Sequence, residues 1–153
     1  FRLKPFAWEP LFDQPFFDAL ASSPRPPDVL VLGFGLWDML YPPDINPERG
    51  VGHFAQSARL FLDALQRIVA ANLSRTRLVW LTVNAISDTK LPEWKRPFMS
   101  LNMSSKYNDV VLPSFDKAGF HTIDGFSISL AHPELSPDGV HFPGRVSRQI
   151  TDL

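Results

Sequence analysis

The sequence predicts an α/β domain with a mainly parallel sheet, and three features support this fold class. Apolar runs at Val29–Leu32 and Arg77–Val83 are continuous rather than alternating, which is typical of strands buried on both faces of a parallel sheet. Segments with helical periodicity separate the runs. Strand and helix patterns then alternate along the whole chain, as in a doubly wound domain.

Composition narrows the class of protein further. The chain has 153 residues, a length typical of one domain, and 44% of them are hydrophobic, enough for a real core. The formal net charge is −1 and no basic stripe is present, which argues against a nucleic-acid partner. No apolar run is long enough to span a bilayer. The absence of cysteine excludes disulfides, thiol catalysis and cysteine-ligated zinc.

The first part of the chain reads as strand, helix, strand and helix. Arg2–Trp8 has the pattern of a strand of mixed polarity, and Gln14–Ser22 that of a short helix capped by Asp13. Tyr41–Gly52 is rich in turn-forming residues and predicts a loop. A long helix is expected from about His53 to Asn72, because apolar residues recur at steps of four and three: Phe54, Ala58, Phe61, Leu65 and Ile68.

The second part continues the alternation after the strand at Arg77–Val83. We expect a long polar loop at Asn84–Met99, then a helix over Ser104–Ala118 that ends at Gly119. A third short strand is predicted at Phe120–Asp124. The remaining segments are a turn-rich loop at His132–Gly139 and a terminal helix over Phe142–Leu153, opened by Pro143.

In open parallel sheets, ligands bind outside the carboxyl ends of the strands. Three segments are expected at that edge: Gly33–Asp38, Asn84–Lys90 and the loop through His141. In Asp138-Gly-Val-His141, the carboxylate could orient the imidazole so that Nε2 acts as a base. The alternative is an ordinary Pro-Asp-Gly turn followed by a surface histidine.

The segment Gly33-Phe-Gly-Leu-Trp-Asp38 is the second candidate. Its two glycines allow a tight turn whose N–H groups face a ligand, while Trp37 offers an indole donor and Asp38 an acceptor. The alternative is a strand-to-helix turn with Trp37 packed on the sheet. Weaker candidates, for which a structural role is favoured, are the polar or titratable residues Asn84, Ser87, Asp88, His53 and His121. The histidine spacing supports no metal site.

Asn72-Leu-Ser and Asn102-Met-Ser fit the N-glycosylation pattern and suggest a secretory lumen. The chain opens on Phe1 inside an expected strand, with neither an initiator methionine nor a signal peptide. We therefore expect that the polypeptide is cut or only partly represented.

These motifs, in this order, resemble the PC-esterase branch of the SGNH/GDSL hydrolases, which includes trichome-birefringence-like polysaccharide O-acetyltransferases and the sialic-acid O-acetyltransferase. Asp138-Gly-Val-His141-Phe-Pro looks like the D-x-x-H block of that family, and Pro27–Asp38, which ends in Leu-Trp-Asp, looks like its middle block. Tyr107-Asn108 is similar to the helix before its last strand. The resemblance implies a three-layer α/β/α flavodoxin-like domain over residues 1–153.

The resemblance also implies the roles of the residues in the site. Asp138 and His141 would complete a Ser-His-Asp triad, and Gly33, Gly35, Trp37 and Asp38 would line the oxyanion and substrate pocket; these are the residues that the family's motifs match. No cofactor and no metal are implied. The substrate would be an acylated glycan or another small acyl ester, in the Golgi lumen or outside the cell.

Two departures from the family pattern matter. No Gly-Asp-Ser nucleophile block occurs in the chain, so we expect the first strand, the serine and the first helix upstream or on another chain. The 153 residues would then be the later two-thirds of the domain, with a place for a partner chain at the sheet edge. The middle block also lacks the oxyanion asparagine; a lost donor of this kind costs about 10²–10³ in rate.

The sequence leaves three possible functions. The first is an acyl esterase or O-acetyltransferase, and the second a catalytically inactive SGNH-like domain that serves as a binding or assembly module. The third is a flavodoxin-like cofactor binder, which is disfavoured because no Gly-rich nucleotide loop is present.

Overall fold

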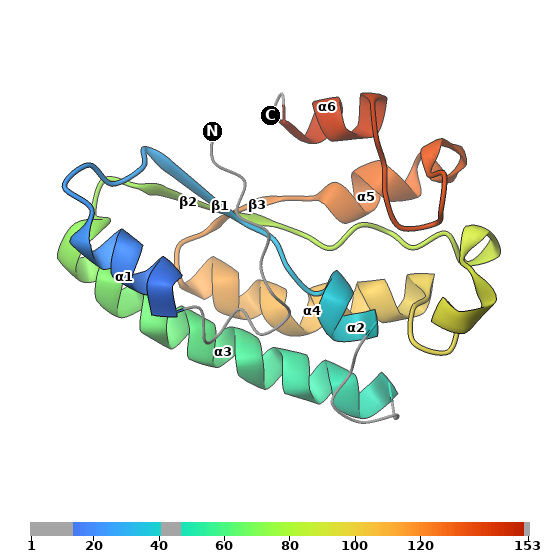
Figure 1. Ribbon diagram of the computed structural model, residues 1–153, viewed down its shortest axis with the longest axis horizontal. Coiled ribbons are helices and arrows are strands. Elements are labelled where there is room, and N and C mark those ends of the chain that lie inside the picture. The colour runs from blue at the N-terminus through green and yellow to red at the C-terminus, as the bar shows by residue number, and fades with distance from the viewer. Residues whose placement is uncertain (1–13, 41–46, 152–153) are drawn as a thin grey trace.

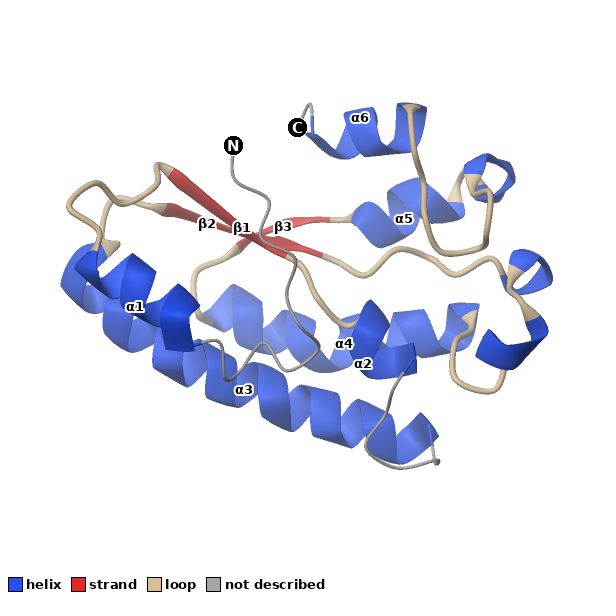
Figure 2. Ribbon diagram, viewed as in Figure 1, coloured by secondary structure: helices blue, strands red, loops and turns tan. Residues whose placement is uncertain are grey.

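The computed structural model describes residues 14–40 and 47–151. Its centre is a parallel sheet in the order β1 (Val29–Leu32), β2 (Arg77–Leu81) and β3 (His121–Ile123), shown in Figure 2. β2 lies in the middle and pairs with both neighbours, Leu32 aligning with Trp80 and Trp80 with Thr122. The predicted α/β class with a parallel sheet is confirmed. The strand expected at Arg2–Trp8 lies outside the described residues.

Helices lie on both sides of this sheet (Figure 1). On one side are α1 (Gln14–Ser22), α2 (Leu36–Leu40), α3 (Pro47–Asn72) and α4 (Leu101–Lys117). On the other side are α5 (Gly125–Leu130) and α6 (Arg145–Thr151), which contact each other. The strands run parallel, so their carboxyl ends meet at one edge, where the loops that follow β1, β2 and β3 begin.

An aromatic cluster fills the space between the sheet and the larger helical layer. Trp80 of β2 stacks on Phe115 of α4, with ring centroids 4.0 Å apart, and Phe34 meets the Trp80 ring edge-on at 4.9 Å. Phe54 of α3 stacks on Tyr107 of α4 at 4.6 Å. Of the predicted apolar stripe on α3, Phe54, Ala58, Phe61 and Leu65 are buried and Ile68 is partly buried.

The two faces of β1 differ. Leu32 is buried toward the helices, whereas Val29 and Val31 are 49% and 50% exposed on the opposite face. The expectation that this strand is buried on both faces is therefore wrong. The reason is topological. The helices on that face of the sheet, α5 and α6, follow β3, and β3 lies at the opposite edge of the sheet from β1. They therefore leave Val29 and Val31 exposed.

Several helix boundaries differ from the expected ones. α3 begins at Pro47, inside the segment predicted as a loop, and α4 begins at Leu101 rather than Ser104. Ser100 caps α4, because its side chain accepts a hydrogen bond from the N–H of Met103.

The short helix α5 was not expected, and α2 is the helix that the alternative strand-to-helix interpretation of Gly33–Asp38 implies. α5 is capped by Asp124, whose carboxylate accepts from the N–H of Ser127. The terminal helix begins later than expected, since α6 starts at Arg145 rather than at Phe142 or Pro143. No helix within residues 14–40 and 47–151 is long and apolar enough to cross a membrane.

Candidate active site

The Asp138–His141 segment forms a tight turn between the 3-10 turn Pro133–Leu135 and α6. Gly139 adopts a φ of 83°, in the left-handed region that favours glycine. Its backbone also presses against the loop after β2: a Cβ at this position would lie 2.7 Å from the carbonyl oxygen of Ser87. The Ser87 N–H donates to the carbonyl of Gly139 over 2.9 Å. Only glycine satisfies both the conformation and the close approach.

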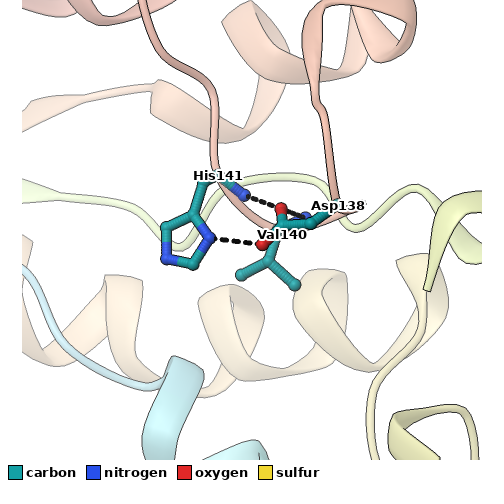
Figure 3. Close-up of polar contacts among 3 residues, drawn as sticks. All are labelled: Asp138, Val140 and His141. Carbon is teal, nitrogen blue, oxygen red and sulfur yellow. Dashed lines mark hydrogen bonds and ion pairs between the residues drawn. The ribbon is translucent and has the colours of Figure 1, made fainter. Parts of the chain in front are cut away.

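The Asp138 carboxylate organises this turn with both of its oxygens (Figure 3). Oδ1 accepts from the backbone N–H groups of Val140, over 3.0 Å, and His141, over 2.8 Å. Oδ2 lies 2.6 Å from Nδ1 of the His141 ring. One oxygen thus fixes the carboxylate to the backbone while the other faces the imidazole, as an orienting aspartate requires.

The same contacts determine the charge of Asp138. Partial burial raises the pKa of this carboxyl, but the hydrogen bonds from the His141 backbone, the His141 ring and the Val140 backbone outweigh it. The net result is a pKa of about 2. Asp138 is therefore ionised at neutral pH and able to stabilise a protonated imidazole.

Hydrophobic anchors on both sides of His141 hold the turn in place. Val140 and Phe142 are buried, and Val146 in α6 is completely enclosed. The side chain of His141 itself is 72% exposed. Within the described part of the chain, Asp138 is its hydrogen-bond partner and no serine hydroxyl is. The structure therefore presents an oriented imidazole whose remaining edge is open to an incoming group.

The loop after β2 forms the platform beneath this turn. The Thr82 N–H still donates to the Ile123 carbonyl of β3, and beyond it side chains satisfy much of the backbone of this loop. Asn108 of α4 brackets Val83, accepting from its N–H over 2.8 Å and donating to its carbonyl over 3.0 Å. Ser129 of α5 accepts from the N–H of Ala85 over 2.8 Å. Buried polar side chains from two helices therefore fix the path that leads to Ser87.

The glycine turn after β1 lies at the same edge of the sheet. A Cβ on Gly33 would lie 3.1 Å from the Leu81 carbonyl oxygen, and one on Gly35 2.8 Å from a Val83 methyl. Gly35 has a φ of 128°, and its carbonyl accepts from the N–H of Met39 to start α2. The turn is thus packed tightly against β2 and the loop that follows it.

Two side chains of the turn have contrasting environments. The turn leads from β1 into α2, as the alternative interpretation implies, but Trp37 is 57% exposed and does not pack on the sheet. Asp38 is half-buried, and burial raises the pKa of its carboxyl to about 6, against the opposing effect of its own backbone N–H. Burial and the nearby Asp38 carboxylate also raise the pKa of the Tyr107 phenol. The Tyr107 hydroxyl donates to the Asp38 carbonyl over 3.4 Å.

Among the weaker candidates, Ser87 and Asp88 have structural contacts. Ser87 contacts Gly139, and the carboxylate of Asp88 accepts from the N–H of Leu101 at the start of α4. Asn84 packs beside Gly125. His53 is exposed on α3, and His121 is exposed on β3. Within the described ranges, no group of three or more His, Asp or Glu could hold a metal ion.

The two sequons lie in different surroundings. The side-chain nitrogen of Asn72 donates to the carbonyls of Leu20, over 2.7 Å, and Ser23, over 3.2 Å. A glycan on that nitrogen would disrupt this link between α1 and α3. Asn102 is exposed in the first turn of α4. Glycosylation at either site stays a prediction.

Sequence reasoning missed the residues that support the site. Lys90, Asn108 and Ser129 hold the loops around the Asp138–His141 turn, mostly by contacts with backbone carbonyls and N–H groups. Asn108 lies at helical spacing on the same face as Tyr107, Val111 and Phe115, and this position on the apolar stripe is the signal that could have indicated a buried polar role.

No protein-family model matches the chain, and no curated protein sequence matches it either. Among solved structures, the chain is similar to an alpha/beta hydrolase enzyme from the metagenome of Lake Arreo, Spain, with a TM-score of 0.50 and 16% identity. The match covers 82% of this chain and 56% of that chain, so the chain spans little more than half the length of that enzyme. At this identity the likeness shows the fold alone: the chain has an α/β hydrolase-like fold.

Proposed function

We propose that the chain carries the His-Asp part of a serine-dependent acyl-transfer site. The reaction is hydrolysis or transfer of an O-acyl group of the SGNH type, with an acylated carbohydrate as substrate. The observation that carries the proposal is the 2.6 Å contact between Asp138 Oδ2 and His141 Nδ1, with the rest of the His141 ring open. The 153 residues contain no Gly-Asp-Ser block, so the proposal assigns the serine to sequence outside them.

The chemistry follows from the orientation of the ring. With Nδ1–H held by Asp138, Nε2 of His141 is the acceptor for the serine proton. The serine oxygen attacks the acyl carbon, and the protonated imidazole returns the proton to the departing alkoxide. Water or a sugar hydroxyl then gives its proton to Nε2 and takes the acyl group, while the imidazolium returns that proton to the departing serine oxygen. Asp138 stabilises the imidazolium in both halves of the reaction.

The Gly33–Asp38 turn is proposed as the oxyanion and substrate side of the pocket. It lies at the same edge of the sheet as the Asp138–His141 turn, and its glycines keep the backbone close to β2. Trp37 is more than half exposed there, and its ring would line the substrate side of the pocket. Backbone N–H groups at Gly33 and Gly35 would replace the asparagine donor that the middle block lacks.

The test compares two histidines of one loop in the complete polypeptide that contains this chain. His141→Ala should lower kcat/KM for p-nitrophenyl acetate and for an O-acetylated sugar by about 10³-fold or more. His132→Ala is the matched control, since this ring also faces a carboxylate, that of Glu134, over 3.4 Å. We expect the control to stay near the wild-type rate. Full activity of His141→Ala would refute the proposal.

A second function rests on the exposed face of β1. If the complete protein and His141→Ala are equally inactive toward acyl esters, the domain serves as a binding or assembly module instead. Val29 and Val31, each about half exposed, would then be the surface that a partner chain covers. The proposed lumenal setting, with glycosylation at the exposed Asn102, fits either function, whereas a glycan on Asn72 would break its contacts with Leu20 and Ser23.

A further inference from the structure

Lys90 contacts the segment before the Asp138–His141 turn in an unusual way. Its ammonium donates to three backbone carbonyls: Pro133 over 3.0 Å, Glu134 over 2.8 Å and Ser136 over 2.7 Å. The donor and its acceptors are 43 to 46 residues apart in the chain. A surface lysine is ordinarily hydrated and flexible. Here three protein carbonyls surround one ammonium, so we infer that the side chain has a specific structural role.

A second contact fixes the same segment from the other end of the Lys90 turn. Lys90 ends the 3-10 turn Asp88–Lys90, and Ser87 immediately precedes that turn. The Ser87 N–H donates to the Gly139 carbonyl. The segment from Pro133 to Gly139 is therefore held at its start by Lys90 and at its end by Ser87. Asp138 lies between these contacts.

Lys90 holds Ser136 through a hydrogen bond to the Ser136 carbonyl. Ser136 is almost completely buried, and within the described part of the chain its hydroxyl has no hydrogen-bond partner. The carbonyl contact with Lys90 is the shortest of the three and partly buried. A charge-assisted hydrogen bond in such surroundings is stronger than a neutral one, and water replaces it less easily there than at the exposed Pro133 and Glu134 carbonyls.

We propose that Lys90 is a positioning residue for the Asp138–His141 pair. Its ammonium fixes the backbone of Pro133–Ser136, and this places the Asp138 carboxylate beside Nδ1 of the His141 ring. The effect on turnover rests on the function proposed above, whereas the effect on the geometry of the turn does not. The two parts are therefore measured separately.

The first measurement is hydrogen exchange by mass spectrometry on the complete protein, read at peptides covering residues 137–142. The N–H groups of Val140 and His141 are protected by the Asp138 carboxylate. Lys90→Met keeps an unbranched side chain but removes all three donors. We expect exchange at these peptides to become about tenfold faster or more. Lys117→Met, at the end of α4, is the control and should leave them unchanged.

The second measurement separates positioning from folding and from substrate binding. Lys90→Met should lower kcat for acyl-ester hydrolysis by about 10- to 100-fold, because a misplacement of about 1 Å has that effect, while KM changes little. Lys90→Cys should behave in the same way. Alkylation with 2-bromoethylamine then restores an ammonium on a lysine-like side chain, and these 153 residues contain no other cysteine to react. Wild-type protein treated with the same reagent is the control.

The outcomes distinguish the two proposals. Faster exchange and lower kcat in Lys90→Met, both reversed by alkylation of Lys90→Cys, would support the positioning role. If the wild type has no esterase activity, faster exchange that alkylation reverses would still support the placement of the turn by Lys90, and the proposed function alone would fail. Unchanged exchange in Lys90→Met, or faster exchange with unchanged kcat, would overturn the inference.

Discussion

The two glycine turns at the carboxyl edge of the sheet resemble each other in backbone and differ in charge. Gly139 and Gly35 both adopt positive φ angles, 83° and 128°, and both lie where a Cβ would collide with the chain around β2. Each turn carries one aspartate. The pKa of Asp138 is about 2, whereas that of Asp38 is about 6.

The difference comes from the hydrogen-bond donors around each carboxylate, not from the shape of the turn. Asp138 has two backbone N–H groups and an imidazole facing it. Asp38 is desolvated, and its own backbone N–H offsets only part of that effect. A carboxylate surrounded by donors stays charged and can hold an imidazolium, whereas a desolvated one becomes neutral more easily. Asp138 is therefore suited to a triad, and Asp38 is not.

The largest expected effect is on Asp138. In Asp138→Asn, the amide oxygen can still accept from the Val140 and His141 N–H groups, but the amide nitrogen then faces Nδ1 and favours the wrong tautomer of His141. We expect kcat of the complete enzyme to fall by about 10³–10⁴-fold. Asp38→Asn should affect kcat far less. A reversed order of the two effects, measured with p-nitrophenyl acetate, would show that the turns have been assigned the wrong roles.

The next largest effect is on stability, and it separates the strain of a positive φ from the close approach of Gly139 to Ser87. Gly139→Ala places a methyl 2.7 Å from the Ser87 carbonyl and forces alanine to a φ of 83°. We expect a loss of about 2–4 kcal/mol in the free energy of unfolding. Gly144→Ala has a similar φ of 73° but open space around the new methyl, so it should cost only about 1 kcal/mol. Equal losses in urea unfolding would mean that the contact with Ser87 contributes nothing.

The sequence could predict what is local. The alternation of elements, the apolar stripe of α3 and the pairing of Asp138 with His141 depend on short spacings, and each is found in the structure. The start of α4 was misplaced because the Ser100 cap directly follows a segment with two prolines, Asn84–Met99, whose composition alone indicates a loop.

Long-range contacts could not be predicted in this way. The three carbonyls around Lys90 carry no side-chain signal, and they lie 43 or more residues away in the chain. The exposure of Val29 and Val31 depends on which sheet edge α5 and α6 follow, which a continuous apolar run does not encode. The sequence motifs locate the reacting groups, whereas the packing around them appears only in three dimensions.

The smallest expected effect is the pH dependence that Asp38 gives to stability, which is opposite in sign to that of Asp138. The pKa of Asp38 is raised on folding from 3.8 to about 6, so the folded state binds more protons between those values and its stability falls as the pH rises through them. The pKa of Asp138 is shifted the other way, so its contribution to stability is present above about pH 4 and is lost as the pH falls toward 2.

The substitution Asp38→Asn should therefore stabilise the protein at pH 7 by about 1–2 kcal/mol and have little effect at pH 4, because the raised pKa of Asp38 costs stability only at the higher pH. Asp109→Asn, an exposed position on α4, controls for the loss of a surface carboxylate. Thermal unfolding of the three proteins from pH 4 to 7 tests this, and a constant difference between Asp38→Asn and the wild type would show that burial does not control the Asp38 carboxyl.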